Sequence, residues 1–246
     1  MFNFFSNSPR IDGQYKILDK DFNHMKNVLR FKVGEQFLVS YNGQSDLCRL
    51  KEFTANEAIC EIIEENFFDT SLPVSLYLFQ GLLKGDKMEL VAQKAVELGV
   101  DVIVPVEMSR SIVKLDDKKK IERQKRLQAI CESAAKQSKR NSVPVVNEIL
   151  SFNKALELAN SLDLFLVPYE NQEGMSSTIS ALAKMKNGDK VGILIGPEGG
   201  FEQAEIDKAI ELNGISISLG KRILRAETAS ITALSMCMLY SEANLK

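Results

Sequence analysis

The chain has 246 residues, of which 45% are apolar and 26% charged, and its net charge is −2. This length exceeds one typical domain and the composition is that of a globular protein, so we expect one large domain or two unequal ones. A single histidine and four scattered cysteines, with no Cys-x-x-Cys pair, argue against a metal centre. No stretch approaches 18 consecutive apolar residues, and the first residues lack the basic-then-apolar pattern of a signal peptide. We therefore expect a reduced, cytoplasmic protein with no metal and no membrane anchor.

Residues 1–71 are predicted to form a small β-barrel or sandwich. Strand-like segments are separated by turn signals, and one of these, Asn42-Gly43, is typical of a two-residue hairpin. The expected strands span residues 35–41, 46–53 and 57–63. Pro73 marks the boundary to a second domain, residues 72–246, because the pattern changes there.

The second domain alternates between strand and helix patterns. The expected strands span residues 74–80, 102–106, 145–149, 164–167, 191–195 and 215–219. The expected helices span residues 86–98, 116–139, 152–160, 176–186, 202–212 and 227–243. Strands that alternate with helices form parallel sheets with helices on both faces, so we expect a mostly parallel α/β domain.

Most of the basic charge lies in one expected helix. Between Asp116 and Arg140 there are nine Lys or Arg residues and four Asp or Glu residues, a local charge of +5, so the remainder of the chain carries −7. A basic helix on an acidic protein can contact phosphates, but a solvated helix face has the same pattern. The charge count alone leaves both interpretations open.

Two glycine-marked turns near the carboxyl end carry the main functional signal. They lie in VGILIGPEGGF (residues 191–201) and in ISISLGKRILRAETASITAL (residues 215–234), and each follows a short apolar strand. Gly199 and Gly200 permit a tight turn or the close approach of a ligand to the backbone. The first turn matches neither the dinucleotide-binding G-x-G-x-x-G pattern nor a P-loop. Because ligands bind outside the carboxyl ends of strands in open α/β sheets, the two turns are predicted to line one pocket.

Further motifs extend the pattern over nearly the whole chain. Residues 24–34 match H-x-x-x-V-L-R-x-x-x-G, residues 87–89 read KME, residues 93–99 read QKAVELG, and residues 137–144 match Q-S-x-R-x-x-V-P. Together with LIGPEGG and SLGKRILRAETA, these motifs resemble the bacterial 16S rRNA (uracil-N3) methyltransferases. That family belongs to the knotted (SPOUT) class of RNA methyltransferases that depend on S-adenosylmethionine. Two positions depart from its pattern: Ser109 stands where Glu is frequent, and Lys136 stands where an acid is usual.

The resemblance has implications for fold, substrate and assembly. It implies an RNA-binding, PUA-like β-barrel at residues 1–71 and an α/β methyltransferase domain at residues 72–246 that ends in a trefoil knot. It implies S-adenosylmethionine as the methyl donor and N3 of a specific uridine in the 16S rRNA of the 30S subunit as the acceptor. It also implies a homodimer with the site at the interface between the subunits.

The residues of the two turns and the matched motifs are the expected site. Uracil N3 must lose its proton before it can attack, so the site needs a proton acceptor and a cation near the uracil oxygens. The candidate cations are Arg110, Arg225 and Arg140. Glu198 and Glu227 are candidates to accept the proton or to orient an arginine, and the sequence does not rank them. The expected donor-binding residues are Leu194, Ile195, Gly196, Pro197, Glu198, Gly199, Gly200, Ser218, Leu219, Gly220, Ile223, Leu224 and Arg225. The expected RNA-binding residues are His24, Arg30, Lys32, Lys87, Gln137 and Arg140.

Three alternative functions remain open from the sequence. One is a metabolic nucleotide-binding enzyme, which would have to explain the strand-rich front domain with His24 and Arg30. A knotted ribose 2′-O-methyltransferase would use a similar donor site, but those relatives usually carry an N-x-x-x-R segment and a Ser-Leu-Asn run in the last motif, where this chain has Leu224-Arg225-Ala226-Glu227-Thr228. A non-catalytic RNA-binding factor of ribosome assembly would not bind the donor.

Overall fold

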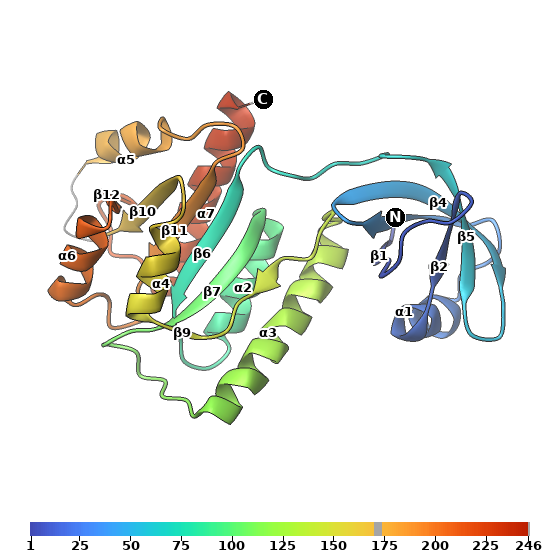
Figure 1. The fold of residues 1–246 in the computed structure, drawn as a ribbon, viewed down its shortest axis with the longest axis horizontal. Helices are drawn as coiled ribbons and strands as arrows, with labels where there is room; N and C mark the ends of the chain where they lie inside the picture. The colour runs from blue at the N-terminus through green and yellow to red at the C-terminus, as the bar shows by residue number, and fades with distance from the viewer. Residues whose placement is uncertain (170–173, 246) are drawn as a thin grey trace. The chain divides into compact units, whose positions relative to one another are not determined.

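The chain divides into two compact units (Figure 1). The computed structural model describes residues 1–169 and 174–245. The first unit contains Met1–Ser71 and Ala135–Val143, and the second contains Leu72–Ala134 and the described residues from Pro144 onward. The segment Ala135–Val143 therefore belongs with the amino-terminal unit, although it lies far from it in the sequence.

A curled five-stranded sheet forms the first unit (Figure 1). The strands are β1 (Asn3–Phe5), β2 (Gln14–Ile17), β3 (Gln36–Tyr41), β4 (Gln44–Phe53) and β5 (Ala58–Glu64), in the order β1-β3-β4-β5-β2. Asn42 and Gly43 join β3 to β4 with φ angles of 49° and 80°, the positive values that a two-residue hairpin turn requires. The predicted hairpin is confirmed. The sequence pattern does not predict β1 and β2, because three and four residues are too few to show an alternation.

A helical segment corrects the expectation that the first unit contains only strands. The helix α1 (Asp19–Asn23) continues into a π-helical turn, η1 (His24–Val28). Phe22, Met25 and Leu29 recur at helical spacing along it; Met25 belongs to the core cluster of this unit, and Phe22 and Leu29 pack against that cluster. The helix is short, and strand-like segments dominate the rest of the unit, which is why this spacing does not stand out in the sequence.

The second unit is built on a seven-stranded sheet in which every pairing is parallel. Its strands are β6 (Ser75–Gly81), β7 (Val100–Glu107), β8 (Val145–Val146), β9 (Leu150–Ser151), β10 (Leu164–Pro168), β11 (Lys190–Ile195) and β12 (Ile215–Ile217). The order is β12-β10-β11-β6-β7-β8, and β9 also pairs with β7. The predicted parallel α/β domain is confirmed. Of the strand expected at residues 145–149 only Val145–Val146 forms, and a second short strand follows at Leu150–Ser151, because an edge strand has only one neighbour to hold it in register.

Helices follow the strands as the alternation predicts. They are α2 (Lys87–Glu97), α3 (Asp117–Gln137), α4 (Phe152–Ala159), α5 (Met175–Leu182), α6 (Gln203–Glu211) and α7 (Ala226–Asn244). Helix α5 ends before the predicted residue 186, and the other bounds differ little from those expected. In the part of the chain that the structure describes, no helix is both long and apolar enough to cross a lipid bilayer.

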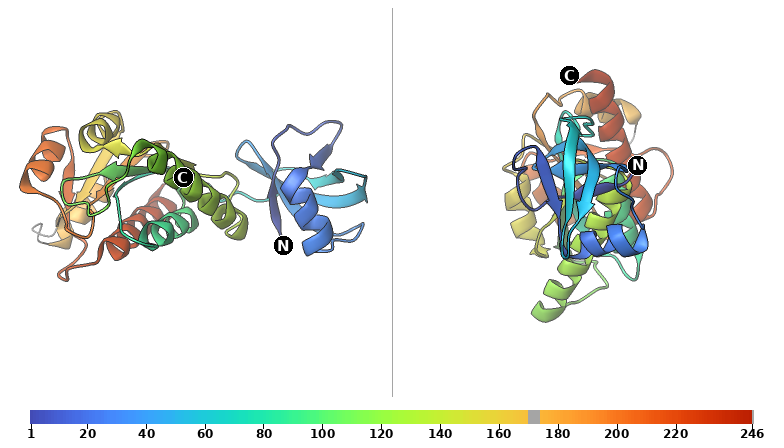
Figure 2. Two further views of the ribbon diagram at one scale, coloured as in Figure 1. Left: turned by 90° about the horizontal axis from the view of Figure 1, so that it is seen from below. Right: turned by 90° about the vertical axis from the view of Figure 1, so that its right-hand side faces the viewer.

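The alternation of side chains along β6 shows how the two faces of this sheet are covered. Phe79 packs with Phe165 and with residues of α4 and α6, such as Leu156 and Ile206, on one face. Helices α2 and α7 lie together on the other face (Figure 2). Gln80 points towards that face, because its side chain bonds to Ser230 of α7. The carboxyl ends of β11 and β12 reach the same edge of the sheet, with only β10 between them. The turns that follow these two strands are therefore close together.

Candidate functional site

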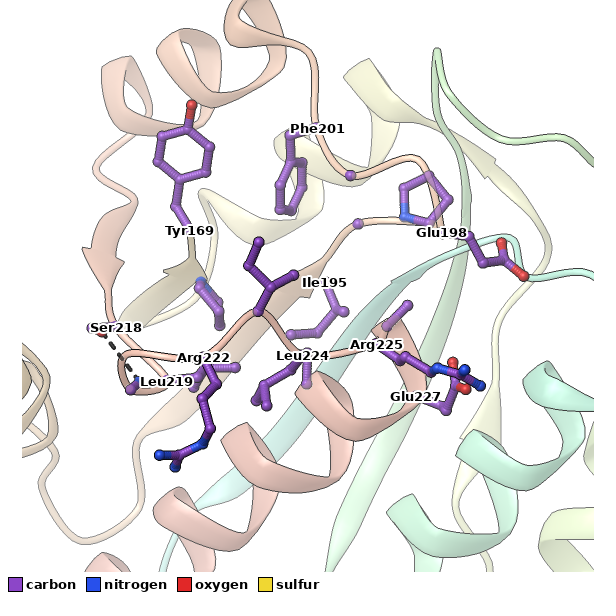
Figure 3. Close-up of a pocket in the computed structure, with 18 of the residues that line it drawn as sticks. Tyr169, Ile195, Glu198, Phe201, Ser218, Leu219, Arg222, Leu224, Arg225 and Glu227 are labelled. Atoms are coloured by element: carbon purple, nitrogen blue, oxygen red, sulfur yellow. Dashed lines mark hydrogen bonds between the residues drawn. The ribbon is translucent and has the colours of Figure 1, made fainter. Parts of the chain in front are cut away.

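A pocket of about 990 Å³ opens where the two glycine turns meet (Figure 3). It is lined by Ile195–Phe201 after β11 and by Ser218–Glu227 after β12, together with Ala229. The loop after β10 adds Pro168, Tyr169, Gly174 and Met175, and Lys87 comes from the start of α2. A cavity of this size lies within the range of small-molecule sites.

The first turn is a tight bend that depends on two of its glycines, Gly200 for its backbone angle and Gly199 for lack of space. The amide of Gly200 donates a hydrogen bond to the carbonyl of Pro197 at 2.9 Å, and Gly200 has a φ of 68°. A Cβ atom at Gly199 would lie 2.9 Å from Cβ of Arg110. Helix α6 begins directly after this turn with a capping box between Glu202 and Glu205.

Neighbouring loops hold the first turn from outside. The backbone amide of Lys84 donates to Oε1 of Glu198 at 3.0 Å, and the guanidinium of Arg110 donates to the carbonyl of Gly199 at 3.2 Å. Glu205 also holds the loop of Arg110, because its buried carboxylate accepts a hydrogen bond from the amide of Ser109 at 2.9 Å. The arginine loop and the glycine turn are thus tied together through backbone groups.

The second turn is held by one buried hydroxyl. Oγ1 of Thr178, on α5, donates to the carbonyl of Ser218 at 2.8 Å and accepts from its amide at 2.9 Å. The side chain of Ser218 in turn accepts a hydrogen bond from the amide of Gly220 at 3.2 Å (Figure 3). Gly220 has a φ of 107°, which residues with a side chain rarely adopt. Thr178 therefore shapes the turn although it lies 40 residues away.

The rings of Tyr169 and Phe201 form one end of the pocket, the apolar end, and Glu198, Arg225 and Glu227 form the charged end (Figure 3). Lys221 and Arg222 also line the pocket, and Figure 3 shows Arg222 apart from the charged end. The hydroxyl of Tyr169 donates to Oε1 of Gln203 at 3.0 Å, which leaves its ring as part of the wall. Flat apolar walls beside exposed backbone groups suit an aromatic base such as adenine.

Lys87 bridges the two glutamates of the charged end. Its Nζ atom lies 3.3 Å from Oε1 of Glu198 and 3.9 Å from Oε2 of Glu227. Burial on its own would raise the pKa of the Glu198 carboxyl, but hydrogen bonds from the Lys84 amide and from Lys87 outweigh it, so the pKa lies below the ordinary value. The Oε2 atoms of both glutamates are buried without a hydrogen-bond partner among the described residues. Buried carboxylate oxygens are costly unless a donor reaches them, so this end is suited to a ligand that carries N–H groups.

Comparisons with known proteins agree with this geometry. A family model described as an RNA methyltransferase domain matches residues 70–238, and one described as an RNA methyltransferase PUA domain matches residues 17–63. The chain is 37% identical to the ribosomal RNA small subunit methyltransferase E of Bacillus subtilis (strain 168), over 93% of this chain and 91% of that protein. The chain belongs to the ribosomal RNA small subunit methyltransferase E family.

Other members of this family cover the whole chain equally well. The protein of the same name from Mesomycoplasma hyopneumoniae (strain 232) is 35% identical over 97% of this chain and 99% of that protein. The crystal structure of the ribosomal RNA small subunit methyltransferase E from Neisseria gonorrhoeae, bound to S-adenosyl methionine, has a TM-score of 0.83 at 31% identity and covers 97% of each chain. The resemblance to this family that the sequence motifs indicate is confirmed.

The pocket brings together nearly all the residues that the motifs assign to donor binding in this family. Every expected donor-binding residue except Leu194 lines it. Leu194 lies in the core cluster on the α4 and α6 face, because successive side chains of β11 point to opposite faces of the sheet. Of the expected catalytic residues, Glu198, Arg225 and Glu227 line the pocket. Arg110 is exposed behind Gly199, and Arg140 is buried in the first unit.

The expected RNA-binding residues do not form one group. His24, Arg30, Lys32 and Gln137 are exposed on the first unit, where the ring of His24 also meets the edge of Phe4. Lys87 lies in the second unit and is engaged by the two glutamates of the pocket. Its place in the KME motif gives no indication of this ion pair.

Sequence reasoning misses the contribution of the loop after β10. Tyr169 and Met175 line the pocket, yet no local motif marks them. In a parallel sheet, a strand that lies between β11 and β12 must end between their turns, so the loop after it must reach the pocket. The sequence does not give the order of the strands, and without that order this loop cannot be identified. No cluster of three or more His, Cys, Asp or Glu side chains suited to a metal ion occurs within residues 1–169 and 174–245.

Proposed function

We propose that this chain transfers the methyl group of S-adenosylmethionine to N3 of a uridine in the 16S rRNA of the 30S subunit. Membership of the family makes it an S-adenosylmethionine-dependent rRNA methyltransferase. The observation that carries the proposal is the pocket itself, which joins an apolar end, two glycine turns and a charged end where two buried carboxylate oxygens accept no hydrogen bond from the described residues.

The residues present fit the methyl donor. Backbone groups of the two turns reach the pocket without interference, because Gly199 and Gly200 carry no side chain and Gly220 holds a backbone angle that other residues avoid. Ile195, Leu219 and Leu224 supply apolar walls for the adenine. When bound, the donor supplies a methyl group on a positively charged sulfur, which a nucleophile can attack.

The charged end of the pocket offers a proton acceptor and a cation for the uridine. The N3 proton must pass to an acceptor, and the electron pair left on N3 then forms the bond to the methyl carbon as the carbon–sulfur bond breaks. We assign the proton acceptor to Glu227, because Glu198 already accepts hydrogen bonds from Lys84 and Lys87 and its pKa is lowered. Arg225 is the candidate cation that lines the pocket beside Glu227, where it would stabilise the negative charge on the uracil oxygens (Figure 3).

The first unit is the proposed RNA-binding module, with residues 1–71 as its main body and residues 72–246 as the methyltransferase domain. The match of a PUA domain model to residues 17–63 supports this division. The cations Arg30 and Lys32 are exposed there, and exposed cations of this kind contact phosphates. Arg140 is better suited to shaping this unit than to catalysis, because it is only 6% exposed.

Two finer features of the family, a trefoil knot and a homodimer, are part of the same proposal. The chain leaves the edge strand β12, passes the first turn and enters α7, which packs on α2, and such a path is compatible with threading through a loop. Ile223 beside the pocket and Leu239 on α7 are 86% and 67% exposed. In the proposed homodimer a second copy of the chain covers these two side chains.

The test is to identify the methylated nucleoside and the residue that takes its proton. Small ribosomal subunits from cells that lack the enzyme are incubated with the chain and labelled S-adenosylmethionine, and the nucleosides are separated by mass spectrometry. We expect 3-methyluridine and a reverse-transcription stop at the modified base. Glu227→Gln should lower kcat about 100-fold while the Kd for the donor stays within a few-fold, and Glu211→Gln, at the exposed end of α6, should change neither.

Other outcomes would favour other functions. A 2′-O-methylated nucleoside would show a ribose methyltransferase. A chain that binds subunits but not the donor would be a non-catalytic factor.

A further inference from the structure

Gln80 is a polar residue in the middle of an apolar sheet. It is the penultimate residue of β6, pairs in register with Ile195 of β11 and is 0% exposed. Its neighbours Leu78 and Phe79 are equally buried and apolar. Burying an amide side chain is unfavourable unless its donors and its acceptor are all engaged, so the reason for this residue lies in its partners.

The partners of Gln80 connect it to both turns of the pocket. Its Nε2 atom donates to the carbonyl of Gly81 at 3.1 Å and to the carbonyl of Gly196, in the first turn, at 3.4 Å. Its Oε1 atom accepts from the hydroxyl of Ser230 at 2.5 Å. The same hydroxyl is 2.9 Å from the carbonyl of Ala226, the first residue of α7 and the end of the second turn.

The network fixes the orientation of the amide. Two carbonyl oxygens face one end of the side chain, and carbonyl oxygens only accept hydrogen bonds, so the NH₂ group must point towards them. The carbonyl of the side chain then faces Ser230, whose hydroxyl must act as the donor. Reversing the amide would bring three oxygens together, so no other arrangement satisfies these groups.

The backbone of β6 next to Gln80 also contacts the first turn. A Cβ atom at Gly81 would lie 2.6 Å from the nitrogen of Pro197. The end of β6 is therefore in direct contact with the first turn, and a small displacement at this point moves the wall of the pocket.

We propose that Gln80 is a positioning residue that sets the spacing between the two donor-binding turns, through Gly196 on one side and Ser230 on the other. This inference rests on the proposed function, because it concerns the same donor site. Gln80 does not line the pocket itself, so its effect on the donor passes through the backbone of the turns. The class of ligand affected is the adenosine-containing methyl donor.

The test compares two variants of the network with two matched controls. Gln80→Leu removes the hydrogen bonds at nearly constant size, and Ser230→Ala removes one hydroxyl. Gln128→Leu is the control for the first variant, because Gln128 also joins two backbone groups, the carbonyl of Pro144 and the amide of Val146, away from the pocket. Ser241→Ala is the control for the second, because Ser241 is a fully buried serine of α7 that bonds only within the helix.

The measurements are the Kd for S-adenosylmethionine by calorimetry, the Tm, and kcat and KM for the donor. We expect Gln80→Leu and Ser230→Ala to raise the Kd and the KM about tenfold with a smaller change in kcat. The double variant should bind the donor with the same Kd as Gln80→Leu alone, because both changes break the same network. The two controls should lower the Tm and leave the Kd unchanged.

An unchanged Kd in both pocket variants, alongside a fall in Tm like that of the controls, would overturn the inference and leave the proposed function intact. Additive effects of the two changes would also overturn it. If Gln80→Leu fails to fold, the Kd of Ser230→Ala still decides between these outcomes, because that variant loses only one hydroxyl. A wild-type chain that does not bind the donor would overturn the proposed function, and the inference with it.

Discussion

Gly81→Ala is the substitution for which the structure makes the sharpest prediction. The added Cβ atom would lie 2.6 Å from the nitrogen of Pro197, 2.8 Å from its Cδ atom and 3.0 Å from the carbonyl carbon of Gly196. Ordinary contacts of a Cβ atom begin near 3.4 Å, so β6 and the first turn must separate by about 0.8 Å. The atoms in the way are mainly backbone, which cannot rotate aside as a side chain can.

The expected consequence is a displaced donor pocket. Overpacking of this kind costs about 1–3 kcal/mol of stability, and a shift of about 1 Å at a binding site can cost about 100-fold in rate. We expect Gly81→Ala to lower the Tm and to raise the Kd for S-adenosylmethionine at least tenfold, measured by calorimetry well below the Tm.

Gly192→Ala is the matched control for this substitution. Gly192 lies in the neighbouring strand β11, where a new Cβ atom would meet the Cδ1 atom of Leu162 at 2.8 Å and the rings of Phe165 and Phe79 at 3.2 Å. These are side-chain atoms of the core, away from the pocket, so this variant should lose stability and keep its donor affinity. Wild-type affinity in folded Gly81→Ala, or an equal loss in Gly192→Ala, would refute the reasoning.

Three further predictions concern charge and thiol groups. Lys87→Met removes the cation that bridges Glu198 and Glu227, and it should lower methyl transfer to small subunits at least tenfold. The control Lys94→Met breaks an exposed pair with Glu97 and should have no effect on methyl transfer. Equal activities of the two variants would contradict this prediction. Because the folded-state pKa of Glu198 lies below the ordinary 4.5, its charged form stabilises the fold above that value, and this contribution is lost as the pH falls through the lowered pKa. The difference in Tm between wild type and Glu198→Gln should therefore be constant from about pH 7 to 5 and shrink below about pH 4, and a difference that stays the same down to about pH 3 would argue against it. Burial raises the pKa of Cys60 and of Cys237 to about 12, and all four cysteines are buried, so a thiol reagent at about pH 8 should label none of them in the folded chain and all four in denaturant, as counted by mass spectrometry.

The parts of this fold that can be predicted from sequence are those with a strong local signal. Asn42-Gly43 predicts the first hairpin because few other residues tolerate positive φ at both turn positions. The alternation of apolar strands and amphipathic helices predicts the parallel sheet of the second unit, since only that arrangement buries both patterns. The two glycine turns stand out for the same reason: each ends an apolar strand with residues that suit a tight bend.

Other features have no local signal because they depend on contacts made after folding. The carboxyl end of α3 and the residues after it belong to the first unit, where Lys136 pairs with Asp21 at 2.6 Å across 115 residues. The sequence shows only that Lys136 departs from the family pattern. The salt bridge, which the sequence does not indicate, gives this residue a structural partner. The residues of α1 are likewise recognisable as a helix only once the sheet that they cover is in place.

Local patterns along the chain thus establish the strand-rich first unit, the parallel sheet of the second and the position of the two glycine turns, because backbone conformation and hydrophobic periodicity depend on near neighbours. The pairing of Lys87 with Glu198 and Glu227 arises only when α2 lies beside α7 and the turn after β11. The link from Gln80 to Gly196 and Ser230 arises only when β6, β11 and α7 lie side by side. Gln80 and Ser230 are 150 residues apart. Side chains so distant in sequence have no common local pattern, and strand order and helix packing alone bring them within hydrogen-bonding distance.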